Sequence, residues 1–495
     1  MTVLAHQTDT LTRDALAVLQ PGFEGTTAPA WLLRRLGEGL HSVGLFGRNI
    51  TSPGQLARLT AQLRAERDDV LVAIDEEGGD VTRLEVREGS SFPGNLALGT
   101  VDDTGLTRDV ARELGRRLAA CGVNLNWAPS ADVNSNPDNP VIGVRSFGAD
   151  THLVARHTAA YVEGLQAAGV AACTKHFPGH GDTNVDSHLA LPRIDADPDT
   201  LAARELVPFK AAVEAGTKAV MSAHILVPAL DATRPATLSP RILTGLLRGE
   251  LGYEGLIVTD GMEMNAIAGT YGIERGSVLA IAAGADAICV GGGLADEATV
   301  LRLRDALVAA VREGTLPEER LADAAARVRE LAEWTRGKRA AAVPGAPEGS
   351  APGIGLTAAR RALVLTGRAS AVEAPYVATL APVANIAVGD ETPWGVAAEL
   401  AALLPKTASA VYPQGSTAAD ILAAAGSRTV VAVVRDAHRH RWMTQALDAL
   451  VAARPDTVVV EMGVPQAGPR GALHIATHGA SRVCGRAAAE VIAGV

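Results

Sequence analysis

The stretch Val170–His188, VAACTKHFPGHGDTNVDSH, decides the expected fold and site more than any other part of the sequence. It begins with an apolar run typical of a buried strand and continues into a segment with three histidines, two aspartates and a lysine. Burying so many titratable groups costs free energy unless they are paired or open into a pocket. From His176 to Pro192 no helix or strand pattern is found, and loops of that length are usually functional. The sequence therefore predicts a site of chemistry at the end of this strand.

Short apolar runs alternate with amphipathic, helix-like stretches up to about residue 335. The runs are Ala15–Leu19, Val43–Phe46, Val70–Ile74, Asn124–Ala128, Ala171–Thr174, Ala219–Ser222, Leu256–Val258 and Ala287–Val290. Strands alternating with helices indicate an α/β fold, and this number of strands favours a TIM-like (β/α)8 barrel over residues 1–335. A doubly wound open sheet is the alternative. The first run, Ala15–Leu19, could equally be helical.

Charged and polar side chains follow five of the predicted strands. They are Asp75 and Glu77, Asp132 and Arg145, Lys175 and His176, His224, and Asp260. In a parallel barrel the carboxyl ends of the strands meet on one face, where the active site lies. Core packing does not explain polar groups at five separate strand ends. The pattern therefore supports both the barrel and a site on that face.

A second unit is expected after residue 335. Residues 336–353 are rich in Ala, Pro and Gly, which is typical of a linker. Residues 354–495 are expected to form a second α/β domain with a parallel sheet. Its strands are predicted at Ala362–Leu365, Ala384–Val388, Ala408–Tyr412, Val430–Val434 and Val458–Met462. No phosphate-binding glycine motif or catalytic cluster is found there, so a structural or oligomerisation role is favoured.

Composition excludes several classes of protein. A net charge of −10 over 495 residues argues against a general nucleic-acid binder, and the basic run His438–Arg441 is typical of a solvated helix start. The four cysteines form no CxxC pair and are expected to be buried free thiols in a reducing compartment. No basic segment followed by an apolar core opens the sequence, and no apolar run approaches the roughly 20 residues needed to span a bilayer. A cytoplasmic location without membrane contact is expected.

Three groups of residues are candidates for chemistry. Asp260, at the end of a buried strand and before a glycine, can act as a nucleophile or a general base, or can be only a turn aspartate. Asp186 and His188 are two residues apart, so the carboxylate can orient the imidazole for proton transfer. Carboxylates beside glycines, as in DEEGG from Asp75, can hold sugar hydroxyls. Arg145 alone is weak as a signal.

A metal site is the competing interpretation of the same loop. Its candidate ligands are His176, His180, Asp182, Asp186 and His188. Their spacing matches no structural zinc pattern, and Lys175 would place a positive charge against a cation. No metal and no cofactor are therefore expected.

Together the motifs resemble the family 3 glycoside hydrolases, and specifically their bacterial β-N-acetylglucosaminidase (β-N-acetylhexosaminidase) branch. The carrying segments, in the family's order, are DEEGG from Asp75, Asn126–Gly148, Lys175–His188 and VTDGM from Val258. The resemblance implies a TIM-like catalytic barrel followed by an αβα sandwich. It implies that Asp260 is the nucleophile and that His188, paired with Asp186, is the acid/base. It also implies that the −1 subsite is formed by Asp75, Arg145, Lys175 and His176, with Arg83 in support.

The implied function is that of a retaining exo-β-N-acetylglucosaminidase that acts on peptidoglycan or chitin fragments through a covalent glycosyl-aspartate. The expected partner is a small carbohydrate with a terminal N-acetylglucosamine. A neutral histidine repels phosphate less than a glutamate would, so phosphorolysis is an alternative. A metal-dependent barrel hydrolase and a non-catalytic sugar-binding protein are two others. One departure from the family is Asp80, where members commonly carry arginine.

Overall fold

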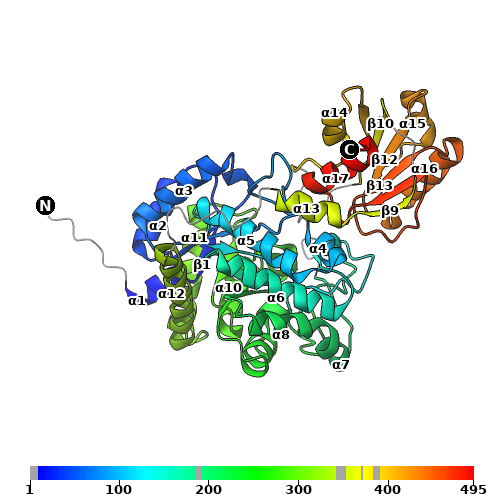
Figure 1. Cartoon of the computed structure of the whole chain (residues 1–495). Helices are drawn as coiled ribbons and strands as arrows, with labels where there is room; N and C mark the ends of the chain where they lie inside the picture. Colours follow the sequence, from blue (N-terminus) through cyan, green and yellow to red (C-terminus); the bar gives the residue numbers. More distant parts are fainter. Residues whose placement is uncertain (1–8, 186–190, 342–352, 369–371, 383–390) are drawn as a thin grey trace.

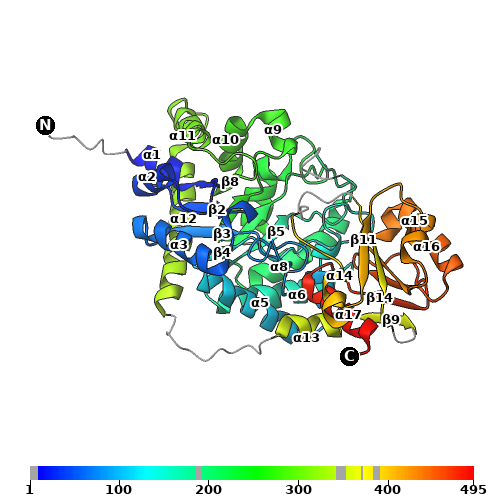
Figure 2. The same cartoon turned by 90° about the horizontal axis from the view of Figure 1, so that it is seen from above.

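The computed structural model describes residues 9–185, 191–341, 353–368, 372–382 and 391–495, and the statements below concern these residues. The chain forms a barrel followed by a smaller unit built on a second sheet (Figure 1). In both views α13 (Ile354–Arg361) and α17 (Arg482–Ala493) lie between the barrel and the second sheet (Figures 1 and 2). The two units therefore pack against each other.

The barrel strands follow one another in chain order. They are β1 Leu19–Pro21, β2 Ser42–Leu45, β3 Leu71–Ile74, β4 Leu125–Asn126, β5 Ala171–Phe177, β6 Ala219–Ser222, β7 Leu256–Thr259 and β8 Ile288–Val290. Strands β2 to β7 form one parallel sheet, a parallel bridge between Val258 and Ala287 adds β8, and β8 pairs in parallel with β1. The side chain of Gln20 in β1 donates to the Ser42 hydroxyl in β2, at 2.6 Å. The strands thus curl into a TIM-like barrel, as predicted, and the open-sheet alternative is wrong.

The first predicted strand is mostly helical. Helix α1 spans Thr10–Ala17, begins where the Asp9 carboxylate accepts from the Thr12 amide at 2.7 Å, and is followed by β1 from Leu19. Residues 14 to 17 are buried, so the apolar run is the core-facing end of an amphipathic helix. A short apolar run of this kind does not distinguish a helix from a strand.

Helices surround the barrel, and several begin at a side-chain cap. Asp103, Asp150 and Asp296 accept from backbone amides at the starts of three of them. After α1, the helices of this unit are α2 Ala30–Glu38, α3 Pro53–Glu66, α4 Asn95–Val101, α5 Thr104–Ala120, α6 Thr151–Ala167, α7 Pro198–Thr200, α8 Leu206–Glu214, α9 Asn265–Tyr271, α10 Ile273–Ala283, α11 Glu297–Arg312 and α12 Glu318–Ala341. Its three-ten and π turns are η1 Gly47–Asn49, η2 Gly143–Arg145, η3 Leu201–Glu205, η4 Ala236–Leu238 and η5 Arg241–Glu250.

The second unit is a sheet with helices on both faces. Its strand order is β11-β10-β12-β13-β14-β9, parallel except that β9 runs antiparallel to β14 at the edge. The strands are β9 Val364–Gly367, β10 Tyr376–Leu380, β11 Ala408–Tyr412, β12 Val430–Val434, β13 Val458–Glu461 and β14 Leu473–Ala476. The helices are α13, α14 Ala397–Leu403, α15 Ala418–Ala425, η6 Ala437–Arg439, α16 Arg441–Ala453 and α17. One apolar cluster includes Leu400 and Cys484, and another includes Ile421 and Leu447, so each face has its own core.

The predicted second sheet differs from the observed one at three points. The sheet is not purely parallel, because edge strand β9 reverses, and strands β10 and β14 were not predicted. The strand expected at Ala384–Val388 lies outside the described residues. Strand β14 has only four residues, LHIA, and includes a histidine, so it resembles a loop more than a core strand.

The junction between the units is partly helical. Helix α12 continues to Ala341, so the first six residues of the expected linker belong to it, and α13 begins at Ile354. Ala358 of α13 is packed into the main barrel core. The four cysteines are buried free thiols, as predicted. Among the described residues no helix is long and apolar enough to cross a membrane.

Candidate active site

Four charged side chains meet where β3, the η2 turn and β5 end on the same face of the barrel. The Lys175 ammonium lies 2.6 Å from Asp75 Oδ1 and 2.6 Å from Glu77 Oε1. The Arg145 guanidinium donates to both oxygens of Glu77, at 3.0 Å from Nε and 2.7 Å from Nη2. Two cations and two carboxylates are therefore joined in one network.

Burial and pairing set the charges in this network. Burial alone would raise the pKa of Glu77, but Arg145 and Lys175 outweigh it and hold that pKa well below its usual range. The pKa of Lys175 is raised, because Asp75 and Glu77 outweigh the effect of burial. The Glu77 and Lys175 side chains are 3% and 2% exposed, whereas Asp75 is 22% exposed. Asp75 is thus the carboxylate of the network that is open to a ligand.

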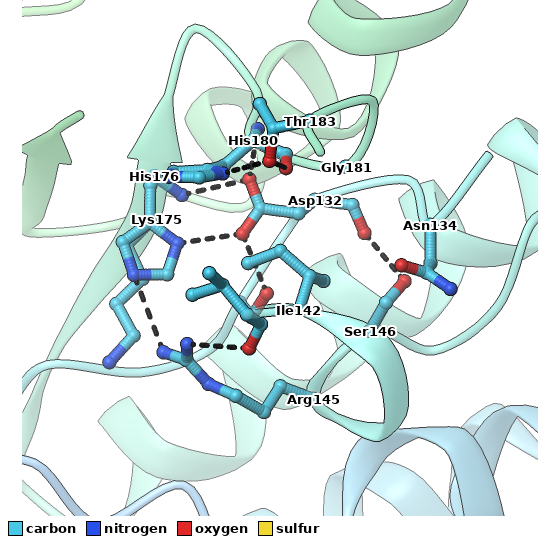
Figure 3. Close-up of polar contacts among 12 residues, drawn as sticks. Asp132, Asn134, Ile142, Arg145, Ser146, Lys175, His176, His180, Gly181 and Thr183 are labelled. Carbon is cyan, nitrogen blue, oxygen red and sulfur yellow. Dashed lines mark hydrogen bonds and ion pairs between the residues drawn. The ribbon is translucent and has the colours of Figure 1, made fainter. Parts of the chain in front are cut away.

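A second network centres on the fully buried Asp132 (Figure 3). Asp132 Oδ2 lies 2.7 Å from His176 Nδ1, and Oδ1 accepts from the backbone amides of His176 and His180, at 3.2 and 2.7 Å. Burial raises the pKa of Asp132, but His176 outweighs this and the pKa lies at about 2. The carboxylate therefore orients the His176 ring by accepting from Nδ1–H, and His176 Nε2 lies 3.4 Å from Arg145 Nη2.

His180 packs edge-on against His176, with ring centroids 5.9 Å apart. Burial and the neighbouring His176 lower the pKa of His180 to about 4, so its ring is neutral at neutral pH. Its Nδ1 lies 2.9 Å from the Thr183 hydroxyl, and its Nε2 has no hydrogen-bond partner among the described residues. His180 therefore contributes packing and a hydrogen bond to the loop, and no positive charge at neutral pH.

Glu76 organises the loop that follows β3. One of its carboxylate oxygens accepts from the Thr82 hydroxyl and from the backbone amides of Arg83 and Leu84, at 3.1, 2.7 and 2.8 Å. Burial raises the pKa of Glu76 to about 7. The turn brings the Arg83 guanidinium within 3.7 Å of Asp75 Oδ2.

Asp260 is held at the end of β7. Its Oδ1 accepts from the Gly261 amide at 2.8 Å, and its own amide donates to the Ser222 carbonyl at 3.2 Å. His224 Nε2 lies 3.0 Å from the Gly261 carbonyl and braces the same turn. Besides burial, the charges of Asp75 and Asp260 both raise the pKa of Cys173 in β5. Asp260 thus stands at the carboxyl end of β7, on the face of the barrel where β3 and β5 also end.

The remaining predicted pair, Asp186 and His188, lies outside the described residues. The stem that leads to it is well anchored. Asn136 Nδ2 donates to the Thr183 carbonyl at 3.3 Å and to Asn184 Oδ1 at 2.6 Å. Arg204 pairs with Asp182 at 2.7 Å.

For two residues of the site, the sequence predicts only a position after a strand and no role. Glu77 bridges Lys175 and Arg145, and Asp132 orients His176. Their position at strand ends was the available signal, but partners distant in sequence cannot be read from it. Among the described residues no cluster of three or more His, Cys, Asp or Glu side chains is arranged to hold a metal ion.

Asp80, the departure from the family pattern, faces the second unit. Its side chain is 1% exposed, pairs with Arg435 at 2.5 Å, and accepts from the Ala480 amide at 2.7 Å. Burial raises the pKa of Asp80, and Arg435 opposes that rise. Where the family commonly has an arginine in the barrel loop, this chain has Asp80, and the arginine beside it is Arg435 of the second unit.

Comparisons with known proteins agree with this geometry. The model of the glycosyl hydrolase family 3 N-terminal domain matches residues 34–331. Beta-hexosaminidase A of Pseudoalteromonas piscicida is 37% identical over 312 residues, which are 58% of this chain and 52% of that protein, so the chain spans about half of that relative's length.

Two solved structures are similar over much of the chain. A family 3 β-N-acetylglucosaminidase from Paenibacillus sp. str. FPU-7 is 35% identical with a TM-score of 0.87, and the match covers 98% of this chain and 97% of that one. NagZ from Neisseria gonorrhoeae, solved with N-trifluoroacetyl-D-glucosamine, is 32% identical with a TM-score of 0.55, over 63% of this chain and 89% of that one. Because the family model covers more than half of the chain, this protein belongs to glycosyl hydrolase family 3, in the branch of the bacterial β-N-acetylhexosaminidases.

Proposed function

We propose that this glycosidase is a retaining exo-β-N-acetylglucosaminidase that releases terminal N-acetylglucosamine from peptidoglycan or chitin fragments. The observation that carries the proposal is the charged network of Asp75, Glu77, Lys175 and Arg145 on the barrel face where the Asp260 carboxylate ends β7. Two relatives support N-acetylglucosamine as the sugar that is released: one is named a beta-hexosaminidase, and the other was solved with a glucosamine derivative.

The charged network suits a sugar with many hydroxyl groups. Asp75 is the most open of its carboxylates and can accept from two neighbouring hydroxyls, while Lys175 and Arg145 can donate. His176 presents Nε2 on the same side as Arg145. These groups are already paired with one another, so a bound sugar needs little reorganisation of the protein.

The proposed mechanism has two steps. Asp260 attacks the anomeric carbon and forms a glycosyl ester, while His188, oriented by Asp186, gives its proton to the departing oxygen. The neutral His188 then takes a proton from water, which attacks the same carbon and releases the sugar with retained configuration. Asp260 leaves as a carboxylate, so both residues return to their starting protonation states.

Phosphate could replace water in the second step, because the acid/base is neutral at that point and does not repel an anion. Chromatography of the products, with and without millimolar phosphate, separates the two outcomes. Free N-acetylglucosamine in phosphate buffer supports hydrolysis, whereas the sugar 1-phosphate would establish phosphorolysis.

The nucleophile is tested by trapping it. We expect a 5-fluoro-β-N-acetylglucosaminyl fluoride to lose its anomeric fluoride and leave a covalent sugar on the peptide that contains Asp260, as measured by mass spectrometry. Asp260→Ala should lose both labelling and turnover while keeping its circular dichroism spectrum. A label on another carboxylate would contradict the assignment of Asp260.

A further inference from the structure

The second unit touches the barrel at the loops that build the site. One part of this contact is the segment Arg435–His438, which follows β12. Arg435 pairs with Asp80, directly after the glycines of the DEEGG motif, and its guanidinium lies over the Trp394 ring, 5.9 Å from the centroid. His438 Nε2 lies 2.9 Å from the Pro137 carbonyl, in the loop that follows β4.

This segment is held rigidly from within the second unit. The buried Glu461 carboxylate, at the end of β13, accepts from the backbone amides of Asp436, Ala437 and Gly463, at 2.9, 3.1 and 2.8 Å. Asp436 has a left-handed backbone with a φ of 53°, and its own carboxylate accepts from the Val464 amide at 2.8 Å. A non-glycine residue in that conformation is retained only where its surroundings determine it. These hydrogen bonds tie the conformation of the segment to the end of β13.

The contact at Pro137 continues to the catalytic loop. Asn136, the preceding residue, donates to the Thr183 carbonyl and to Asn184 Oδ1, three and two residues before Asp186. Asn139, two residues further on, donates to the His180 and Gly181 carbonyls, at 2.9 and 3.0 Å. One short stretch of the β4 loop thus contacts His438 on one side and the stem of the acid/base loop on the other.

We infer that His438 is a positioning residue, and that the second unit braces the acid/base loop through His438, Pro137 and Asn136. The inference rests on the proposed function, in that it takes the loop beyond Asn184 to carry the general acid. It assigns the second unit a role in the reaction that needs no contact with the substrate.

The prediction is a change in the dependence on the leaving group. Misplacing the acid slows cleavage of a poor leaving group, which needs a proton, more than cleavage of an acidic phenol, which does not. We therefore expect full-length His438→Ala to lose kcat/KM on both a methyl and a dinitrophenyl N-acetylglucosaminide. The loss on the methyl glycoside should be about two- to tenfold larger than the loss on the dinitrophenyl one. The KM for either substrate should change little.

Two variants separate positioning from a merely structural role. His438→Gln keeps an N–H donor at a similar reach and should restore most of the activity on the methyl glycoside. Arg439→Ala lies on the same η6 turn, and among the described residues its side chain has no hydrogen bond or ion pair to the barrel, so it should behave like the parent protein. Asn136→Ala should reproduce the effect of His438→Ala, and the double variant should be no worse than either one.

The outcomes are distinguishable from failure of the proposed function. The positioning role of His438 is wrong if His438→Ala loses activity equally on both substrates, or if His438→Gln does not restore activity. It is also wrong if the effects of His438→Ala and Asn136→Ala add up. His188→Ala run in parallel should show the largest dependence on the leaving group. If it shows none, the acid/base assignment itself is wrong.

Discussion

Lys175 compensates the negative charges of two carboxylates in the site, because its ammonium lies between Asp75 and Glu77. A charge-assisted hydrogen bond of this kind contributes about 1.5–3 kcal/mol, so Lys175→Met should lower kcat/KM by about ten- to a hundredfold on N-acetylglucosaminides. Steady-state kinetics measures this loss. Lys210→Met, on the exposed side of α8, is the control. Unchanged kinetics for Lys175→Met would remove Lys175 from the sugar site.

Glu76 makes the stability of the fold depend on pH. Its folded pKa of about 7 lies above its usual 4.5, so between these values the folded state holds a proton that the unfolded state has released. Stability from this group is therefore complete below about pH 4.5 and is lost as the pH rises toward 7. Glu76→Gln keeps an acceptor for the three hydrogen bonds and never ionises.

We expect urea unfolding of Glu76→Gln to match the parent protein at pH 4.5 and to exceed it by up to about 3 kcal/mol at pH 8. Glu88→Gln, an exposed residue of the same loop, should show no such trend. A constant difference between Glu76→Gln and the parent protein across the pH range would mean that Glu76 stays ionised when folded.

At the scale of elements, the site depends on how closely the β4 and β5 loops approach each other. A Cβ added to Gly181 would lie 1.7 Å from the Val133 carbonyl oxygen, so Gly181→Ala must push the two loops apart. Such overpacking costs roughly 1–3 kcal/mol of stability and should displace the loop that leads to His188. We expect a lower melting temperature together with a loss of kcat. Gly293→Ala, in the loop after β8 with open space around its Cβ, should keep both.

Most elements of the barrel could be predicted because its strands are short, buried and mostly apolar. The strand-end positions of Asp75, Arg145, Lys175, His176 and Asp260 followed from the same pattern, and the structure brings the first four together. What could not be predicted were pairings across large sequence separations, such as Glu77 with Arg145 or Asp132 with His176. The strand predicted at residues 15–19 was wrong for a different reason, because a helix and a strand bury such an apolar run equally well.

At the scale of the whole molecule, the two units are joined by the packing of Ala358 of α13 into the barrel core and by several polar contacts. Some of these contacts are exposed, as with Arg361 and Asp103, at 2.9 Å and 47% and 39% exposure. The Arg435–Asp80 pair differs because Asp80 is almost fully buried. An exposed pair contributes at most about 1 kcal/mol, whereas removing one partner of a buried pair costs about 3–5 kcal/mol.

Breaking the buried pair should therefore loosen the two units from each other. Arg435→Ala leaves the Asp80 carboxylate buried without its cation, so its pKa should rise further and the variant should be more stable at pH 5 than at pH 8. Calorimetry should show the barrel and the second unit unfolding further apart in temperature, because the contact that couples them has been lost. Adding Asp80→Asn removes the unpaired charge and should recover much of the stability at pH 8. Arg361→Ala should change neither the separation nor its pH dependence. If Arg435→Ala behaves like Arg361→Ala, the second unit is held by its apolar contacts alone, and the aspartate at position 80 has no coupling role.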